Sequence, residues 1–469
     1  MRLLLTTVLT LLLSAGLVWN ASAQPGPDEL RADAPNSVLI QNATVHTVTN
    51  GTLEATDILV EDGIIAEIGT DLNAPSGVDT YDADGHHVMP GIIDAHAHIA
   101  ISDVNEATSP VTAHVNVGDV LDPYDIGLYR ALAGGVTTSH VMHGSANAIG
   151  GQNETIKHRY GMIHPDALRM EEAPRTIKFA LGENPTRVHG EGRGIVPRTR
   201  MGVESVIREA LTDAQRYRAK QEAYEAGDRS APPEHSERLE VVADILSGDV
   251  MVHAHSYRAD EILMLMDVLE DFDIDELVFQ HVNEGFKVAP ELADFGAGAS
   301  IFADWWGFKF EVYYSTAYNA AILTRNGVTT SINSDSPDYN RHLYHQAAKA
   351  QRYGELGDDE ALSLITINAA EHLGIDEYVG SIEEGKHADL AIFDAHPLSI
   401  YAVPQRTYVD GVVRFDRHDD PDDMRLRVDP ESVVEETFVW ENVDVRHGSC
   451  MQYEGTHLHV TESGVHLHN

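Results

Sequence analysis

Hydrophobic and polar residues alternate in the same way near both ends of the chain. Residues 37–88 form short alternating segments around Asn50-Gly51 and Asp62-Gly63, and residues 377–416 repeat the pattern around Asp410-Gly411. Alternation on either side of such dipeptides is typical of antiparallel hairpins. The two flanks therefore predict a small β-sandwich built from both chain ends, with residues 37–88 as its first half and residues 377–416 as its second.

The middle of the chain, residues 89–376, has a different period. Apolar strand-like runs (GVTTSHVM, TIKFALGE, DVMVHAH, ELVFQH, GASIFAD, VTTSINSD) alternate with amphipathic helical stretches such as ADEILMLMDVLEDF and EALSLITINAAEHLG. This alternation predicts an α/β fold with parallel strands, and at about 250 residues a closed (β/α)8 TIM-like barrel is its commonest form. A doubly wound open sheet fits the same pattern, but GEGRG has the wrong spacing for a dinucleotide-binding turn.

The two termini carry segments outside these domains. Residues 1–23 combine Arg2, an apolar stretch and a small-residue ending, which is typical of a cleaved signal peptide. Residues 24–36 form a linker, and residues 417–469 form an acidic, His-rich extension that ends in two His-x-His pairs, which we expect on an accessory hairpin. The protein is thus predicted to be exported, either periplasmic or secreted.

The charge of the chain narrows the choice of partner. There are 75 acidic and 32 basic side chains, a formal net charge of −43. Nucleic acid and anionic membrane surfaces would be repelled, and after the leader no apolar run is long enough to span a bilayer. A single cysteine, Cys450, excludes an internal disulfide. A small-molecule or short peptide substrate is expected, and self-association is compatible with the sequence.

The run MPGIIDAHAHIA contains two histidines that share one face of a strand. Successive side chains of a strand alternate between its faces, so His96 and His98 point the same way. Other candidate ligands also stand at strand ends: His253, His255, His281 and Asp335. In a parallel barrel the strand ends meet on one rim, where catalytic groups gather. We therefore expect these side chains in one site.

Imidazoles and carboxylates in one site indicate a divalent metal. Zn²⁺ suits this donor set best, although Mn²⁺, Co²⁺ and Fe²⁺ are not excluded. A catalytic metal leaves one position for water and lowers its pKa, which produces a hydroxide nucleophile. An adjacent carboxylate can carry the proton to the leaving group, and we assign this role to Asp335.

The motifs PGIIDAHAH, GVTT, SDSP and ITINAAEHLGIDEYVGSIEEGKHADLAIFD occur in this order. Together they resemble the amidohydrolase superfamily, and the chain is most similar to exported imidazolonepropionase-like and Xaa-Pro dipeptidase-like members. The resemblance extends over residues 37–416. It implies a metal-dependent hydrolase that acts on an amide, peptide or cyclic amide carbon–nitrogen bond through a metal-activated hydroxide.

The resemblance also implies which residues bind one or two metal ions. His96 and His98 match the first-strand ligands, His281 the sixth-strand ligand and Asp335 the eighth-strand acid. His253 is preferred to His255 on the fifth strand, since the family's single histidine there is followed by Ala; His255 would line the pocket. Binuclear members bridge their metals with a carboxylated Lys or a Glu, and here Lys178 and Glu183 are equal candidates.

Further polar residues follow the second strand. His140, His143, Lys157 and Tyr160 are candidate substrate contacts, although loop composition alone would supply such side chains. The same metal site would also support a deaminase or a lactone or phosphoester hydrolase, because activated water can attack any of these electrophiles. A non-catalytic exported metal-binding protein is the alternative from another class.

Overall fold

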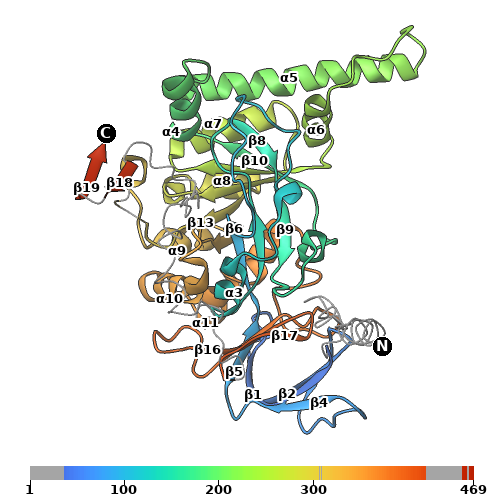
Figure 1. Cartoon of the computed structure of the whole chain (residues 1–469), viewed down its shortest axis with the longest axis vertical. Helices are drawn as coiled ribbons and strands as arrows, with labels where there is room; N and C mark the ends of the chain where they lie inside the picture. Colours follow the sequence, from blue (N-terminus) through green and yellow to red (C-terminus); the bar gives the residue numbers. More distant parts are fainter. Residues whose placement is uncertain (1–35, 306, 308, 419–456, 462–463, 469) are drawn as a thin grey trace, which may run out of the picture.

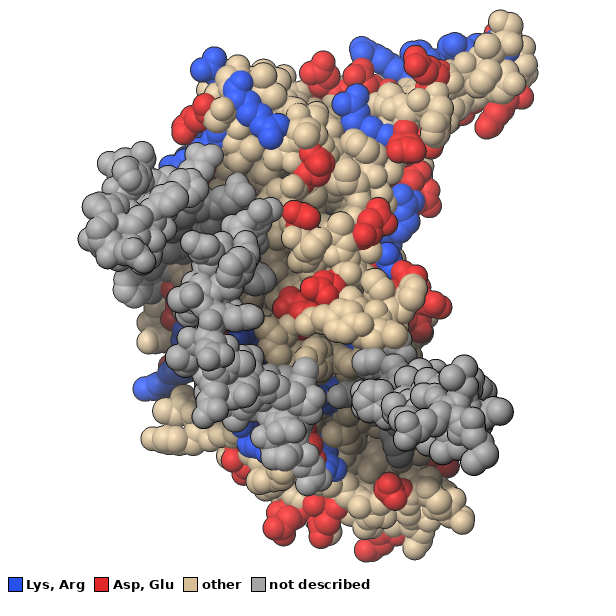
Figure 2. All heavy atoms as spheres, in the orientation of Figure 1, with Lys and Arg blue, Asp and Glu red and all other residues tan. Residues whose placement is uncertain are grey.

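The computed structural model describes residues 36–305, 307, 309–418, 457–461 and 464–468 (Figure 1). The predicted leader (1–23) and nearly all of the linker (24–36) lie outside this part, as does most of the C-terminal extension (417–469). Among the described helices, none combines the length and the apolar character needed to cross a membrane. Acidic side chains are scattered over the face shown in Figure 2 rather than gathered in one patch.

Both flanks of the chain join in one eight-stranded sheet. Its strands are β1 (Val38–His46), β2 (Thr52–Glu61), β3 (Ile64–Gly69), β4 (Asp79–Asp82), β5 (His87–Pro90), β15 (Leu390–Phe393), β16 (Pro404–Val409) and β17 (Val412–Asp416). Their order is β17-β16-β15-β5-β1-β2-β3, with β4 also beside β1. The antiparallel pair of β5 and β15 joins the N-terminal flank to the C-terminal flank. The division of this sheet into two sandwich layers stays a prediction.

The predicted hairpin turns are confirmed. β2 pairs antiparallel with β1 and β3, and β16 with β17. Asp62 and Gly63 have φ angles of 51° and 81°, and Asp410 and Gly411 have 51° and 74°. Positive φ at both central residues defines the type I′ turn, which Asp-Gly favours. The two turns also touch, because a Cβ on Gly63 would lie 2.7 Å from the Asp410 carbonyl oxygen.

Among the described residues, the middle of the chain contributes nine short strands. They are β6 (Ile92–Ala97), β7 (Val136–Val141), β8 (Ile149–Gln152), β9 (Glu154–Lys157), β10 (Thr176–Ala180), β11 (Met251–Ser256), β12 (Leu277–His281), β13 (Gly298–Ile301) and β14 (Thr330–Ile332). Strands β10 to β14 are parallel neighbours in chain order, and β6 is parallel to β7. The Asp335 amide donates a hydrogen bond to the His96 carbonyl (3.0 Å). The segment after β14 therefore lies beside the end of β6.

These strands form a six-stranded sheet in the order β14-β13-β12-β11-β10-β8 and a three-stranded sheet in the order β6-β7-β9, and the last strand of each departs from the predicted parallel pattern. β9 is antiparallel to β7, and β8 is antiparallel to β10. Residues 142–148 between β7 and β8 contain no helix, and without a crossover helix the chain returns antiparallel. Asn153 lies between β8 and β9, where its Oδ1 accepts from the His143 amide (3.1 Å) and its Nδ2 donates to Thr176 Oγ1 (3.0 Å). The prediction of eight parallel strands was wrong here.

Helices separate the parallel strands. They are α3 (Ile126–Leu132), α4 (Glu183–Thr186), α5 (Arg200–Glu225), α6 (Glu237–Leu246), α7 (Ala259–Glu270), α8 (Ala289–Phe295), α9 (Asn319–Arg325), α10 (Leu343–Gly354), α11 (Asp358–Ser363) and α12 (Ile367–Leu373). Short turns of other helix types are η1 (Val117–Val120), η2 (Pro165–Leu168), η3 (Arg187–Glu191), η4 (Gly285–Lys287), η5 (Phe310–Val312) and η6 (Asn340–His342). Figure 1 shows that α5 projects as a long arm beyond the strands.

The amphipathic stretches predicted from the sequence form helices. ADEILMLMDVLE is α7, which buries Ile262, Leu265 and Leu269 on one side. The stretch EALSLITINAAEHLG is divided between α11 and α12. The C-terminal His-x-His pairs lie in an antiparallel hairpin of β18 (His457–Thr461) and β19 (Gly464–His468).

Candidate metal centre

Three buried side chains converge at the C-terminal ends of the strands. His96, His281 and Asp335 each offer one ligand atom, and these atoms all lie within 4.8 Å of one another. Asp335 Oδ1 lies 3.5 Å from His96 Nε2 and 3.2 Å from His98 Nε2, and Asp335 Oδ2 lies 3.7 Å from His281 Nε2. The structure thus brings together the predicted residues of the first, sixth and eighth strands.

The two histidines of β6 are held by hydrogen bonds on their Nδ1 atoms. His96 Nδ1 lies 3.1 Å from Gln280 Oε1, and His98 Nδ1 lies 2.8 Å from the Met142 carbonyl oxygen. Both partner atoms only accept, so we assign the proton of each ring to Nδ1. This tautomer leaves Nε2 of each ring with the lone pair that a metal ligand requires.

The backbone is strained where His281 and Asp335 stand. Their φ angles are 71° and 47°, in the left-handed region that residues with a Cβ rarely adopt. His281 ends β12, and Asp335 follows β14. The turn of the chain at these two residues carries both side chains into the site, and such strain is typical of functional positions.

A buried carboxylate links the first strand to the segment that carries Asp335. Ser334 donates from its amide to Asp94 Oδ1 (3.0 Å) and from its hydroxyl to Asp94 Oδ2 (2.5 Å), and the His96 amide also donates to Oδ1 (3.3 Å). Burial raises the pKa of Asp94 to about 7. Sequence reasoning missed this residue, although Asp94 shares the strand face of His96 and His98 by the same alternation.

The two candidate bridging residues have different surroundings. Lys178 lies buried on β10 with its Nζ 2.9 Å from His96 Nε2. Glu183 begins α4, where its carboxylate lies 3.4 Å from Lys309 Nζ and 3.5 Å from Arg187 Nη2. The structure therefore brings Lys178, rather than Glu183, against the histidines of the site.

The two fifth-strand histidines lie at different depths. In the parallel register His253 is opposite Lys178, whereas His255 is opposite Ala180, one pleat nearer the strand end. The His255 ring lies 4.7 Å from the His281 ring, and its buried Nδ1 has no hydrogen-bond partner among the described residues. The structure therefore places His255, and not the predicted His253, against His281.

His253 has partners deeper among the strands. Gln280 Nε2 lies 3.0 Å from its Nδ1. Its ring lies 4.5 Å from the ring of His140, whose Nε2 lies 2.7 Å from Thr176 Oγ1. Burial lowers the pKa of His140 to about 3. His140, a predicted substrate contact, is instead packed between strands together with His253.

The other predicted substrate contacts also have partners elsewhere. His143 accepts on Nε2 from the Glu106 amide (2.9 Å), and its Nδ1 lies 2.9 Å from the Gly144 carbonyl oxygen. Tyr160 packs its ring 5.5 Å from that of Tyr129. His143 thus binds backbone groups of its own loop and of residue 106, Tyr160 packs against α3, and contact of either side chain with substrate stays a prediction.

Lys157 is the clearest correction among these residues. Its buried Nζ donates to Asp410 Oδ1 (2.5 Å) and to Asp389 Oδ1 (3.3 Å), and lies 2.7 Å from His387 Nδ1. These partners belong to the C-terminal flank, more than 200 residues away in the chain. Lys157 therefore joins β9 to the eight-stranded sheet and does not face the metal centre.

Aromatic rings support His281 from one side. The Phe302 ring stacks on the His281 ring (4.5 Å, 19°), and Trp305 stacks on Phe302 (4.4 Å, 11°). Phe302 is buried and follows β13. The stack restricts the orientation of His281, and no motif in the sequence had pointed to it.

The charge state of the cluster suits a cation. Burial lowers the pKa of His281 to about 3 and that of His96 well below its ordinary value, so both rings are neutral at pH 7. Burial would raise the pKa of Asp335, but His281 and His98 hold it at about 2. Both ring nitrogens of His281 are buried without a hydrogen-bond partner among the described residues. These donors fit a divalent metal.

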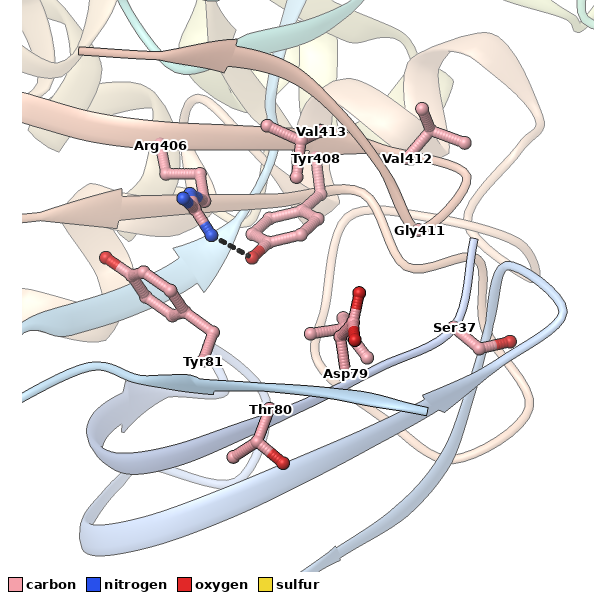
Figure 3. A pocket seen from close by; sticks show the side chains of 10 residues that line it. Ser37, Asp79, Thr80, Tyr81, Arg406, Tyr408, Gly411, Val412 and Val413 are labelled. Carbon is pink, nitrogen blue, oxygen red and sulfur yellow. Dashed lines mark hydrogen bonds between the residues drawn. The ribbon is translucent and has the colours of Figure 1, made fainter. Parts of the chain in front are cut away.

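A separate pocket of about 430 Å³ lies on the eight-stranded sheet (Figure 3). Arg406 lies over the Tyr81 ring (4.1 Å), donates to the Tyr408 hydroxyl (3.3 Å) and is ion-paired with Asp416. The residues that line this pocket include no histidine or cysteine. It therefore lacks the donor set found at the strand ends.

Comparison with known proteins places this chain in a family. Residues 314–415 match the amidohydrolase family. Amidohydrolase tasK of Hapsidospora irregularis is 33% identical over 393 residues, which are 77% of this chain and 40% of tasK. Imidazolonepropionase of Thermoplasma volcanium is 23% identical over 358 residues, 73% of this chain and 84% of that protein.

A solved structure agrees with the sequence matches. The crystal structure of an amidohydrolase from Thermotoga maritima has 35% sequence identity and a TM-score of 0.76, and the match covers 81% of this chain and 100% of that chain. The protein belongs to the amidohydrolase family of enzymes, as the sequence motifs predicted, and it has a TIM-barrel-type fold of mixed α/β content. The chain spans only 40% of the length of tasK.

Proposed function

We propose that the protein is a metal-dependent hydrolase that cleaves the carbon–nitrogen bond of an amide, peptide or cyclic amide. The observation that carries this proposal is the buried convergence of His96, His281 and Asp335 at the strand ends. Imidazole and carboxylate groups that converge at the strand ends of such a fold are typical of a catalytic metal site. Family membership supports the same reaction class.

The ligand set that the contacts favour differs in part from the one predicted. We assign His96, His98, His281 and Asp335 as ligands, with His255 from the fifth strand in place of His253. Lys178, beside His96 Nε2, is the preferred bridging residue if two ions bind. Nitrogen and oxygen donors favour Zn²⁺. When bound, such an ion polarises the scissile carbonyl and lowers the pKa of the attacking water.

Asp335 is the residue to which we assign proton transfer. Its pKa of about 2 keeps it ionised at neutral pH, so it can accept a proton from water. The same carboxyl group then delivers that proton to the leaving nitrogen. Its backbone hydrogen bond to His96 holds it beside the first-strand histidines while the proton moves.

The test is hydrolysis by purified zinc-loaded protein of a panel of dipeptides, cyclic amides, lactones, phosphoesters and aminated bases. We expect a cyclic amide or dipeptide to be cleaved, and Asp335→Asn to lower kcat by at least about 100-fold. Asp249→Asn, which changes an exposed acid before β11, serves as the control. Turnover of aminated bases or esters alone would favour the alternative hydrolases.

Export is part of the proposal, because residues 1–23 resemble a signal peptide. Intact mass measurement of the protein recovered from the periplasm or medium tests it, and the expected mature chain begins at Gln24. A chain that retains Met1 inside the cell would contradict export without affecting the hydrolase assignment.

If zinc-loaded protein cleaves nothing and Asp335→Asn retains its metal, the non-catalytic alternative gains support.

A further inference from the structure

Three histidines meet outside the catalytic centre, where the eight-stranded sheet lies against α11. His46 ends β1, His87 begins β5, and His396 follows β15. The ring centroid of His46 lies 5.1 Å from that of His87 and 4.8 Å from that of His396, and His87 lies 5.7 Å from His396. Each ring thus touches the other two, although the residues are far apart in the chain.

Two nitrogens of this cluster already face one another. His46 Nε2 lies 2.9 Å from His87 Nδ1, and His46 Nδ1 lies 3.1 Å from Thr52 Oγ1. Two nitrogens on one tetrahedral Zn²⁺, each about 2.0–2.1 Å from it, lie about 3.3 Å apart. The pair therefore needs only a small separation to chelate an ion. The Thr52 hydroxyl supplies the outer partner that orients a ligating imidazole.

The third ring brings a carboxylate with it. The Leu398 amide donates to His396 Nδ1 (3.2 Å), which assigns the proton of this ring to Nε2, and Nε2 lies 3.3 Å from Asp358 Oδ2. The side chain of His396 is 34% exposed and that of Asp358 is 59% exposed. Rotation of both toward the His46–His87 pair, which releases the Leu398 amide from His396 and Gln351 from Asp358, would complete a set of three nitrogens and one oxygen.

The His46 and His87 rings are uncharged at neutral pH. Burial, followed by repulsion from His396 and His87, lowers the pKa of His46 to about 4, and burial and His396 lower that of His87. Glu54 and Asp358 act in the opposite direction on these rings, and His86 acts in the same direction. Neutral imidazoles can bind a metal without first losing a proton.

We propose that His46, His87 and His396, together with Asp358, form a second metal site for a divalent ion such as Zn²⁺. Four protein ligands without an open position are typical of structural zinc. The ligands come from β1, β5, the segment after β15 and α11, so a bound ion would tie both flanks of the sheet to a helix of the middle segment. The site shares no residue with the catalytic centre.

The test measures zinc in the untagged full-length protein. Metal-depleted wild type, His87→Ala, His396→Ala and the control His235→Ala are equilibrated with Zn²⁺, and bound zinc is determined by elemental analysis. His235 is an exposed histidine 3.0 Å from Glu240 Oε1, so it matches the His396–Asp358 pair without further imidazoles. The His-rich segment 457–468 is present in every protein, and differences between the proteins therefore report on the cluster.

We expect both cluster variants to bind one zinc ion fewer per chain than wild type or His235→Ala. Zinc should also raise the melting temperature of wild type by more than that of His396→Ala, since an ion that binds only the folded state stabilises it. His396→Ala removes a partly exposed side chain and should fold. Equal zinc content and equal zinc-dependent shifts of the melting temperature in all four folded proteins would overturn the proposal. The three histidines would then only hydrogen-bond to their neighbours.

Discussion

Ser334 Oγ donates to Asp94 Oδ2 over 2.5 Å, and this contact joins the strand of His96 and His98 to the residue before Asp335. The Ser334 amide and the His96 amide also donate to the other oxygen of Asp94. Asp94 is completely buried. The relative position of the first-strand and eighth-strand ligands therefore depends on the hydrogen bonds of one buried carboxyl group.

Ser334→Ala should weaken this link. The buried Asp94 oxygen loses a donor, and we expect the free energy of unfolding to fall by about 1–3 kcal/mol in urea titrations. We also expect kcat to fall more than KM changes, since Asp335 is displaced from His96. Ser102→Ala, which removes an exposed hydroxyl that donates to Asp103, is the matched control. Unchanged kcat with lowered stability would limit Ser334 to a structural role.

Lys178→Ala and Glu183→Ala should differ in metal content. Lys178 Nζ lies 2.9 Å from His96 Nε2, whereas Glu183 is ion-paired with Lys309 and Arg187. Elemental analysis should show one ion fewer in Lys178→Ala only, because Lys178 alone adjoins the other ligands. A loss confined to Glu183→Ala would reverse the assignment. One ion in all three proteins would exclude a binuclear centre.

The two fifth-strand histidines can be separated in the same way. His255→Asn should lower zinc affinity by at least about tenfold, because the His255 ring lies against His281. His253→Asn should leave zinc affinity nearly unchanged and should instead lower stability, since its ring packs on His140 and its Nδ1 on Gln280. Competition with a chromogenic chelator measures the first effect, and thermal unfolding measures the second. The opposite result would restore His253 as the ligand.

The Asp410 carboxylate, which accepts a hydrogen bond from Lys157, predicts a contribution to stability that is lost in acid. Burial would raise the pKa of Asp410, but Lys157 and Arg159 hold it well below its ordinary value. This carboxylate therefore stabilises the folded state above the unfolded pKa of about 3.9, and the contribution is lost as pH falls below it.

Lys157→Met should remove much of this dependence. The substitution leaves Asp389 and Asp410 without their shared cation. We expect the free energy of unfolding at pH 7 to fall by about 3–5 kcal/mol. Urea unfolding at several pH values measures both effects. Lys220→Met, at an exposed position of α5, should change neither. An equal loss of unfolding free energy in Lys157→Met and Lys220→Met would contradict this role of the network.

His158 predicts a second acid-dependent effect at higher pH. It is buried with Nδ1 3.1 Å from the Val136 carbonyl oxygen and Nε2 2.9 Å from Ser139 Oγ, and burial lowers its pKa from 6.5 to about 3. Below pH 6.5, His158 is protonated in the unfolded chain but stays neutral in the folded protein. The free energy of unfolding therefore decreases as pH falls from 6.5 toward 3. His158→Gln should reduce this slope in metal-depleted protein. His164→Gln, at an exposed position, should not.

The local pattern of hydrophobic and polar residues was sufficient to predict the helices and turns and to place the candidate ligands along the strands. Asp62-Gly63 and Asp410-Gly411 form the predicted turns, because positive φ at two successive residues depends on those residues alone. His281 ends a strand as expected, since side-chain alternation and strand length are also properties of neighbouring residues.

The relations between elements required the tertiary structure. The direction of residues 149–157 depends on the edges of β7 and β10 that they pair with. The choice between His253 and His255 depends on the register of β10 against β11. Lys157 reaches two carboxylates more than 200 residues away. The sequence by itself determined which side chains stand at strand ends; only the folded chain decided which of them meet, because those distances depend on register and packing between segments remote in sequence.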